Sequence, residues 1–200
     1  MARSTEPRIA GVLLAAGAAR RFGSPKQLAC LDGVALVRRS AQALLDAGLP
    51  LTVVTGAHAD AVGAALAGLP LRLIHNADWR EGLGRSIACA VAALGDDAAL
   101  DGVLIALADQ PLVGASQLRR LLAAHEAGAI TAADHGTVVG PPAVFARAHF
   151  AALAALRGDS GARALLAAQA GRLRRVPMPE AAIDIDTPAQ WRAAQAAQRP

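Results

Sequence analysis

The segment LLAAGAARRFGSPKQL (residues 13–28) begins in an apolar run and continues into small, cationic and glycine residues. The apolar run predicts a buried strand, and the Ala-Ala-Gly that follows predicts a loop at the carboxyl end of that strand. Gly17 and Gly23 are expected to supply the positive φ angles that such a loop needs. The segment therefore predicts a strand and a loop whose backbone N–H groups face one point.

The same loop has the residue types of a phosphate-binding site. Arg21 and Lys26 place cations near the expected N–H groups, so a phosphate would meet both hydrogen-bond donors and positive charge. The loop is not a Walker P-loop, which requires Gly-Lys-Ser or Gly-Lys-Thr at a fixed spacing, and it lacks the GxGxxG spacing of a dinucleotide-binding turn. A glycine-rich turn with solvated arginines is the alternative interpretation of this segment taken alone.

Lysine is used at one position only. The chain has nineteen arginines, and Lys26 is its single lysine. A lysine ammonium is a compact charge on a flexible stem, whereas the arginine guanidinium is a planar fork. The lysine at this one position therefore indicates a site that needs a compact charge on a flexible stem rather than any cation.

Apolar runs and helical patterns alternate along the first part of the chain. The apolar runs predict strands at residues 9–14, 51–56, 71–76 and 102–109. The helical patterns lie between and after them, at residues 35–48, 58–68, 86–94 and 116–128. This alternation predicts an α/β fold with a mostly parallel sheet, in which active groups lie at the carboxyl ends of the strands.

The rest of the chain is less regular. Strands are expected at 129–134, 142–145 and 172–179, and helices at 146–156, 160–171 and from residue 188. Pro141 and Pro142 cannot donate to a sheet ladder, so they predict an edge strand or an insertion around residues 134–142.

Three aspartates are candidate metal ligands. Asp109 ends the expected strand 102–109, where a carboxylate suits Mg²⁺ bound together with substrate phosphates. Asp184 and Asp186 alternate with isoleucines, which predicts that both carboxylates lie on one face of a short strand. A second metal contact is one interpretation of this pair. The other is punctuation before a helix, because Thr187-Pro188 is a good helix start.

These motifs, in this order, resemble those of the MobA-like nucleotidyltransferases, and most closely the molybdenum cofactor cytidylyltransferase (MocA) group. The matching segments cover nearly the whole chain: 14–28, 76–87 with Asn76, Trp79, Gly82, Ser86 and Ile87, Asp-Gln-Pro at 109–111, Gly-Asp-x-Gly-Ala-Arg at 158–163 and Asp-Ile-Asp-Thr-Pro at 184–188. The guanylyltransferase sisters tend to have Leu-Ala-Gly-Gly in the first loop. They also tend to have Asn-x-Asn-Thr-Pro near the end of the chain, so Ala16 and the Asp184/Asp186 pair favour the cytidylyl side.

The resemblance implies a three-layer, Rossmann-like nucleotidyltransferase fold in one domain, residues 1–200. Residues 1–112 would form the nucleotide-binding half and residues 113–200 the acceptor-binding half. The implied reaction transfers CMP from CTP to the terminal phosphate of molybdenum-bearing molybdopterin, with Mg²⁺ as cofactor and pyrophosphate as product. A molybdoenzyme or its maturation chaperone would be the protein partner.

The resemblance also assigns roles to residues of this sequence. Lys26, Arg21 and Asp109 would be catalytic, and Mg²⁺ would be held by Asp109 with Asp186, or less favourably Asp184. The residues that would bind the nucleotide are Leu14, Ala15, Ala16, Gly17, Ala18, Lys26, Gly82 and Ser86.

Two departures from the family pattern leave alternatives open. Ala19 stands where a serine is usual, and Gly140-Pro141-Pro142 stands where Gly-His-Pro is common. These changes are compatible with another nucleotide or acceptor, such as guanylyl transfer. They are also compatible with a non-catalytic protein that binds a nucleotide or cofactor.

Composition argues against nucleic-acid and membrane partners. The net charge is +4, but the arginines are scattered and aromatic residues make up only 2% of the chain, too few for a base-stacking surface. Apolar runs fall short of the roughly 18–20 residues that span a bilayer, so we expect a soluble protein. The first apolar stretch is followed by RRFGSPK rather than by a cleavage region, so a cytoplasmic location is expected. Cys30 and Cys89 match no metal or redox spacing and are expected to be free, in the core.

Overall fold

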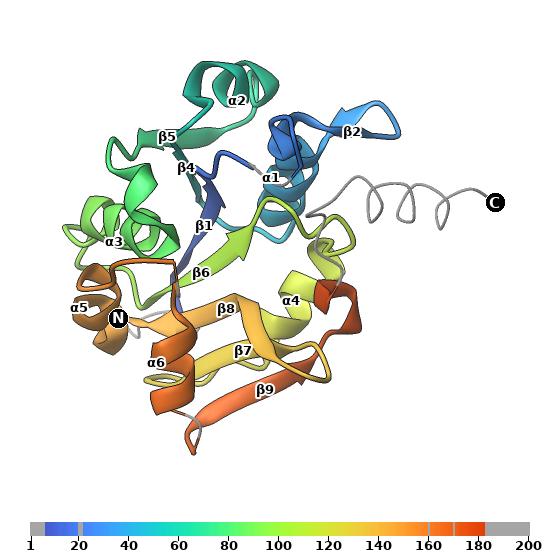
Figure 1. Cartoon of the computed structure of the whole chain (residues 1–200). Coiled ribbons are helices and arrows are strands. Elements are labelled where there is room, and N and C mark those ends of the chain that lie inside the picture. Colours follow the sequence, from blue (N-terminus) through green and yellow to red (C-terminus); the bar gives the residue numbers. More distant parts are fainter. Residues whose placement is uncertain (1–6, 20–21, 160, 170, 183–200) are drawn as a thin grey trace.

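The computed structural model describes residues 7–19, 22–159, 161–169 and 171–182. A seven-stranded sheet runs through the molecule in the order β5-β4-β1-β6-β8-β7-β9 (Figure 1). Its strands are β1 (Ile9–Ala15), β4 (Leu51–Thr55), β5 (Leu71–His75), β6 (Gly102–Leu107), β7 (Ile130–Asp134), β8 (Val139–Ala146) and β9 (Leu173–Pro177). β8 is antiparallel to both of its neighbours, whereas all other neighbouring pairs are parallel. The prediction of a mostly parallel α/β sheet is confirmed.

Helices cover both faces of this sheet and make a three-layer fold. The α-helices are α1 (Leu36–Asp46), α2 (Ala59–Ala65), α3 (Leu83–Leu94), α4 (Ala115–Ala123), α5 (Phe150–Ala154) and α6 (Arg163–Ala168). Short 3₁₀ turns are η1 (Lys26–Leu28), η2 (Trp79–Glu81), η3 (Arg147–His149) and η4 (Pro179–Ala182). A two-stranded hairpin, β2 (Cys30–Leu31) and β3 (Val34–Ala35), precedes α1.

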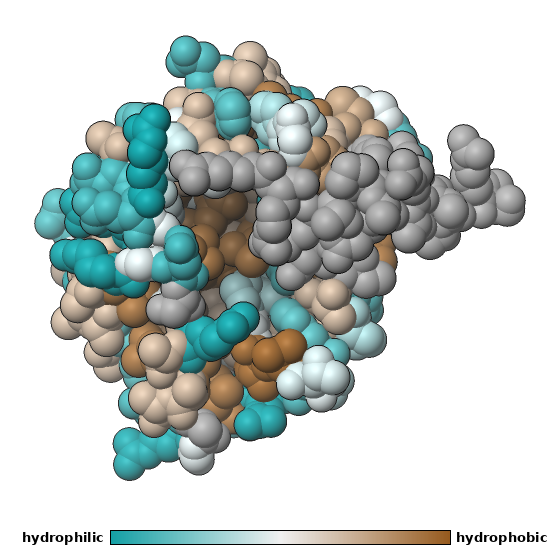
Figure 2. All heavy atoms as spheres, viewed as in Figure 1, coloured by the Kyte–Doolittle hydropathy of each residue, from teal (hydrophilic) through white to brown (hydrophobic). Residues whose placement is uncertain are grey.

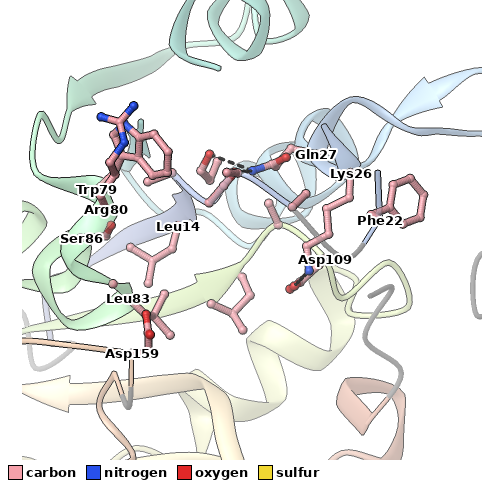
Figure 3. Close-up of a pocket in the computed structure, with 18 residues that line it drawn as sticks. Leu14, Phe22, Lys26, Gln27, Trp79, Arg80, Leu83, Ser86, Asp109 and Asp159 are labelled. Atoms are coloured by element: carbon pink, nitrogen blue, oxygen red, sulfur yellow. Dashed lines mark hydrogen bonds and ion pairs between the residues drawn. The ribbon is translucent and has the colours of Figure 1, made fainter. Parts of the chain in front are cut away.

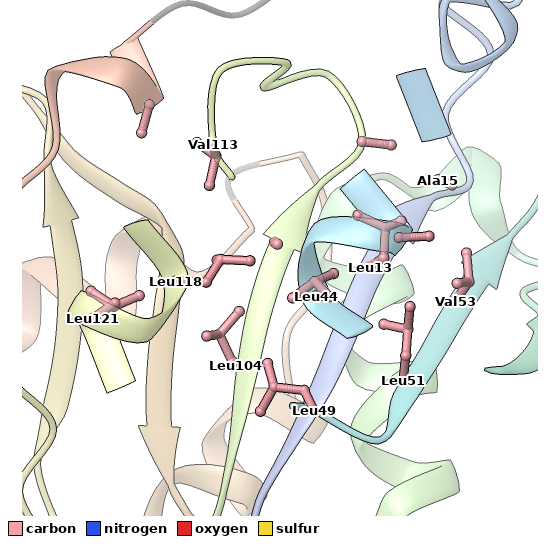
Figure 4. Close-up of a cluster of buried hydrophobic side chains, with 14 of the residues drawn as sticks. Leu13, Ala15, Leu44, Leu49, Leu51, Val53, Leu104, Val113, Leu118 and Leu121 are labelled. Carbon is pink, nitrogen blue, oxygen red and sulfur yellow. The ribbon is translucent and has the colours of Figure 1, made fainter. Parts of the chain in front are cut away.

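Successive residues of the central strand β1 belong to different cores. Leu13 packs in a cluster with Leu44 of α1 and Leu118 of α4 (Figure 4). Val12 packs in the cluster on the opposite face, with Ile87 of α3. Side chains alternate across a strand, so a strand that is buried on both faces is apolar at every position. This explains why the run 9–14 has no polar interruption.

The strand that contains Pro141 and Pro142 lies inside the sheet, so the prediction of an edge or an insertion was wrong. β8 pairs with β6 on one side and β7 on the other. The register jumps from Ala132↔Ala143 to Ala133↔Gly140, so neither proline has a partner in β7. An irregularity of this kind needs no ladder N–H, and it therefore accepts two prolines in an interior strand.

Several local expectations also changed. α3 begins at Leu83, three residues before the expected start at Ser86, because Gly82 with φ 101° ends η2 and directly precedes the helix. Both cysteines are free, but Cys30 is exposed rather than in the core. No helix within the described segments is long and apolar enough to cross a membrane.

Candidate active site

A cavity of about 450 Å³ lies where β1 and β6 end and α3 begins. Figure 2 shows a recess on this face of the molecule, with apolar side chains at its floor. The lining brings together every predicted catalytic, metal-binding or nucleotide-binding residue that the structure describes: Leu14, Ala15, Ala16, Gly17, Ala18, Lys26, Gly82, Ser86 and Asp109. Arg21, Asp184 and Asp186 lie outside the described residues.

Lys26 and Asp109 meet in this cavity although 83 positions separate them in the sequence. The Lys26 Nζ donates to Asp109 Oδ2 at 2.6 Å, and the side chains are only 16% and 18% exposed (Figure 3). η1 carries the lysine towards the carboxyl end of β6, which the aspartate follows. The cavity thus contains a cation and an anion that largely neutralise each other.

The second oxygen of Asp109 makes the residue a suitable metal ligand. Oδ1 is buried, and no described residue forms a hydrogen bond with it. A buried carboxylate oxygen without a partner is unfavourable, and a hard cation is one group that would satisfy it. No three His, Cys, Asp or Glu side chains converge within the described ranges. A metal here would therefore rely on substrate phosphates or on residues outside those ranges.

The loop after β1 presents unused backbone donors. The Ala16 carbonyl accepts a hydrogen bond from the Ala57 N–H at 3.1 Å. Within the described part of the chain, the N–H groups of residues 16–18 have no acceptor. The expected positive φ occurs at Gly23 (78°) but not at Gly17. Ala19 takes the other left-handed position of the loop, with φ 50°.

The far wall of the cavity is formed at the start of α3. Ser86 is buried, and its Oγ accepts a hydrogen bond from Asn76 Nδ2 at 3.0 Å. The Asn76 Oδ1 in turn accepts from the Asp78 N–H at 3.0 Å. Asn76 therefore fixes Ser86 and the turn that leads into η2. Asn76 does not line the cavity itself, so these contacts explain its place in the motif at 76–87.

The site analysis of the sequence missed five polar or aromatic residues that line the cavity: Phe22, Gln27, Trp79, Arg80 and Asp159. The Arg80 guanidinium lies 4.4 Å from the centre of the Trp79 ring. Asp159 lies so close to Gly82 that a Cβ on this glycine would stand 2.4 Å from its Oδ1. Trp79 and Asp159 belong to motifs already identified at 76–87 and 158–163. The motifs therefore contained the signal, and assigning every member to the site would have found them.

Comparisons with known proteins agree with this geometry. The MobA-like NTP transferase domain matches residues 11–175. Nicotine blue oxidoreductase of Paenarthrobacter nicotinovorans is 36% identical over 174 residues, covering 80% of this chain and 82% of that protein. The purine catabolism protein PucB of Bacillus subtilis (strain 168) is 31% identical over 198 residues, covering 92% of this chain and 95% of its own.

A solved structure extends the similarity to three dimensions. Rv0371c of Mycobacterium tuberculosis H37Rv superimposes with a TM-score of 0.83 and 30% identity, covering 96% of this chain and 100% of that one. Another structure of Rv0371c is a complex with manganese. The family match spans most of the chain and includes the loop after β1, Lys26 and Asp109. The chain therefore belongs to the MobA-like NTP transferase family and is a nucleotidyltransferase.

Proposed function

We propose that this enzyme transfers CMP from CTP to the terminal phosphate of molybdenum-bearing molybdopterin and releases pyrophosphate. The observation that carries the proposal is the contact of Lys26 with Asp109 in a cavity that also holds the unused N–H groups of residues 16–18. This set of donors and charges suits a triphosphate better than a neutral ligand, because phosphate oxygens accept from N–H groups and attract the ammonium.

In the proposed reaction, an acceptor phosphate oxygen attacks the α-phosphorus of CTP. The bond between that phosphorus and the β-phosphate oxygen breaks, and pyrophosphate leaves with the bonding electrons. The N–H groups of residues 16–18 would hold the β and γ phosphates, together with Arg21. Lys26 would contact the phosphates near the reacting centre. The protein contributes positioning and charge neutralisation rather than a covalent intermediate.

The proposal includes Mg²⁺ held by Asp109, with Asp186 as a second ligand. The unpartnered Oδ1 of Asp109 supports this assignment. Bound there, the ion would neutralise charge on the phosphates. The manganese complex of Rv0371c supports a divalent cation in this family. The ammonium of Lys26 bonds the Oδ2 of Asp109, and Oδ1 is the oxygen that would meet the cation.

The preference for CTP is proposed from Ala16. Ala16 lines the cavity, and a Cβ on the adjacent Gly56 would stand 2.9 Å from the Ala16 Cβ and 2.7 Å from the Trp79 Cβ. Ala16 is therefore packed closely against Gly56, which has no side chain, while it also lines the cavity. Its methyl group would therefore exclude a purine more readily than a pyrimidine.

The acceptor and the cellular setting are separate parts of the proposal. The acceptor and a partner molybdoenzyme or chaperone would bind on the side built from residues 113–200, in the cytoplasm. The names of the two relatives refer to nicotine blue and to purine catabolism, so family membership alone does not select molybdopterin.

Pyrophosphate release tests the function directly. The purified protein is incubated with Mg²⁺, molybdenum-bearing molybdopterin and CTP, GTP or ATP, and the products are weighed by mass spectrometry. The expected result is pyrophosphate together with a cytidylylated acceptor, and only background release when the acceptor is omitted. Faster release with GTP would overturn the CTP assignment. No release with any nucleotide, despite measurable nucleotide binding, would identify a binding protein instead.

A further inference from the structure

Gln27 lies beneath the loop that follows β1. It is the middle residue of η1, it lines the cavity, and it is only 4% exposed. Its Nε2 donates to the Gly17 carbonyl and also, at 3.3 Å, to the Ala15 carbonyl. One side-chain amide thus holds two carbonyl oxygens of the same loop.

The other end of this amide argues for a specific role. Gln27 Oε1 is buried, and it has no hydrogen-bond partner among the residues that the structure describes. A buried acceptor without a partner is destabilising. Methionine or leucine would fill a similar volume without that penalty, so packing alone does not explain a glutamine. The benefit has to come from the NH₂ group and the two carbonyls that it holds.

Peptide geometry links those carbonyls to the cavity. In a trans peptide unit, the C=O of one residue and the N–H of the next point in opposite directions. Holding the Ala15 and Gly17 oxygens therefore fixes the direction of the N–H groups of Ala16 and Ala18. The unit between them is held as well, because the Ala16 carbonyl accepts from the Ala57 N–H at 3.1 Å.

Three consecutive carbonyls of the loop are therefore bound by other parts of the protein. The N–H groups of the same peptide units, those of residues 16–18, have no acceptor in the described part of the chain. Donors that are oriented before the ligand arrives need no reorganisation when it binds. A glycine in such a loop would otherwise allow its peptide unit to rotate and turn a carbonyl oxygen towards the cavity.

We propose that Gln27 is a positioning residue that orients the loop at residues 15–18 for the polyphosphate chain of the nucleotide. Gln27 does not itself contact the phosphates. It keeps carbonyl oxygens away from them and leaves the N–H groups facing them. This deepens the proposed function and rests on it, since the anion is the triphosphate of the substrate. η1 thus supplies two functions from consecutive residues: Lys26 faces Asp109, and Gln27 faces the loop.

The test separates the phosphate site from the base site. Binding of inorganic tripolyphosphate and of cytidine is measured by calorimetry for the wild type, Gln27→Met and Gln27→Glu. Gln42→Met is the matched control, because Gln42 is exposed on α1 and bonds only Asp46 at 2.8 Å. We expect Gln27→Met to weaken tripolyphosphate binding at least about tenfold and to change cytidine binding less than about twofold. Gln27→Glu should be weaker still, since a carboxylate would face two carbonyl oxygens.

Several outcomes would overturn the proposal. The first is unchanged tripolyphosphate binding by folded Gln27→Met protein. The second is an equal loss of affinity for tripolyphosphate and cytidine, which would indicate general damage to the protein. If neither variant folds, amide resonances of the wild type decide: those of residues 16–18 should shift with tripolyphosphate and not with cytidine. Wild-type protein that binds no tripolyphosphate would remove the loop as an anion site. Each readout is independent of the transfer assay, so failure of this inference and failure of the proposed reaction are distinguishable.

Discussion

The two parts of the sheet differ in how they are built and in what they contribute. Strands β5, β4, β1 and β6 are parallel, and the residues that follow β1 and β6 enter the cavity. Strands β8, β7 and β9 include the antiparallel strand, and among the described residues of this part of the chain only Asp159 lines the cavity. Parallel strands have their carboxyl ends at one edge of the sheet. Short loops after these strands are therefore enough to bring charged side chains together there.

The second part is joined to the first by contacts with backbone. Gln110 Nε2 donates to the Pro141 carbonyl at 3.0 Å and to the Ala181 carbonyl at 2.9 Å. The Gly84 N–H donates to the Gly158 carbonyl at 2.8 Å. These bonds attach β8, η4 and the loop before α6 to the residues that flank the cavity. We call the hydrogen bonds from Gln110 and Gly84 the joint between the two parts. We predict that the chemistry depends on the first part of the sheet and that the joint contributes mainly to stability.

The largest effect is expected at Asp109. Asp109→Asn keeps the shape of the side chain but removes the charge that Mg²⁺ and Lys26 would contact, and metal neutralisation supplies several kcal/mol in such reactions. We expect kcat for pyrophosphate release to fall by about a hundredfold or more while the fold persists. Asp96→Asn, at an exposed position outside the cavity, is the control. Near-normal turnover in folded Asp109→Asn protein would show that the chemistry does not depend on this carboxylate of the first part.

A smaller but specific effect is expected at Lys26. Arg has a broader, planar head, and a misplacement of about 1 Å near the reacting atoms is enough to lower a rate roughly a hundredfold. We expect Lys26→Arg to reduce kcat/KM at least about tenfold, which corresponds to about 1.4 kcal/mol. Lys26→Ala should be worse because the charge is lost. The assay is pyrophosphate release at saturating Mg²⁺, with the melting temperature measured in parallel. Wild-type rates in Lys26→Arg would contradict the assigned role.

The joint should respond in stability rather than in chemistry. Gln110→Met removes the side-chain amide and with it both hydrogen bonds, so the Ala181 carbonyl loses the bond that Gln110 supplies. The Pro141 carbonyl keeps a contact with His135 Nε2 at 2.9 Å. We therefore expect a loss of about 1–2 kcal/mol in the free energy of unfolding, measured by urea titration against Gln42→Met. A tenfold fall in kcat without loss of stability would show that the joint belongs to the catalytic machinery.

The smallest effect concerns acid stability in the second part of the sheet. Burial lowers the pKa of His125, whose Nδ1 lies 3.1 Å from Thr131 Oγ1. Because the folded-state pKa lies below the unfolded value of about 6.5, the unfolded state binds more protons below that pH, and acidification destabilises the fold. His125→Gln should therefore show a smaller drop in melting temperature between pH 7.5 and 5.5 than the wild type, with unchanged turnover at pH 7.5. An equal drop in both proteins would exclude His125 as a source of acid sensitivity.

Sequence patterns identified strands in both parts of the sheet, but they predicted the arrangement of the first part better than that of the second. The strand 9–14 is apolar over its whole length, and the segments 51–56 and 71–76 are rich in Leu, Val and Ile, so local patterns are enough to identify all three. The insertion of β8 between β6 and β7 depends on long-range pairing, which no local pattern contains. Pro141 and Pro142 were therefore assigned to an edge, because the register jump that accommodates them exists only in the folded sheet.

The site shows the same division. The positions of Lys26 and Asp109 at the ends of expected elements predicted that they lie at one edge, and the structure places them in contact. The roles assigned to them remain predictions. Gln27 was missed, since its function depends on which way an amide points and on carbonyls ten and twelve residues away. Neither is visible in a pattern of residue types.

The position of Lys26 gives this protein a built-in reporter. The chain has no other ε-amino group, and this one is held against Asp109 inside the cavity. An amine-selective reagent at low concentration would therefore modify a single lysine-containing peptide, at a rate set by how often the ion pair opens. Following that peptide by mass spectrometry would measure the opening of the site, and its closure by nucleotides, without an introduced cysteine or a fluorescent dye.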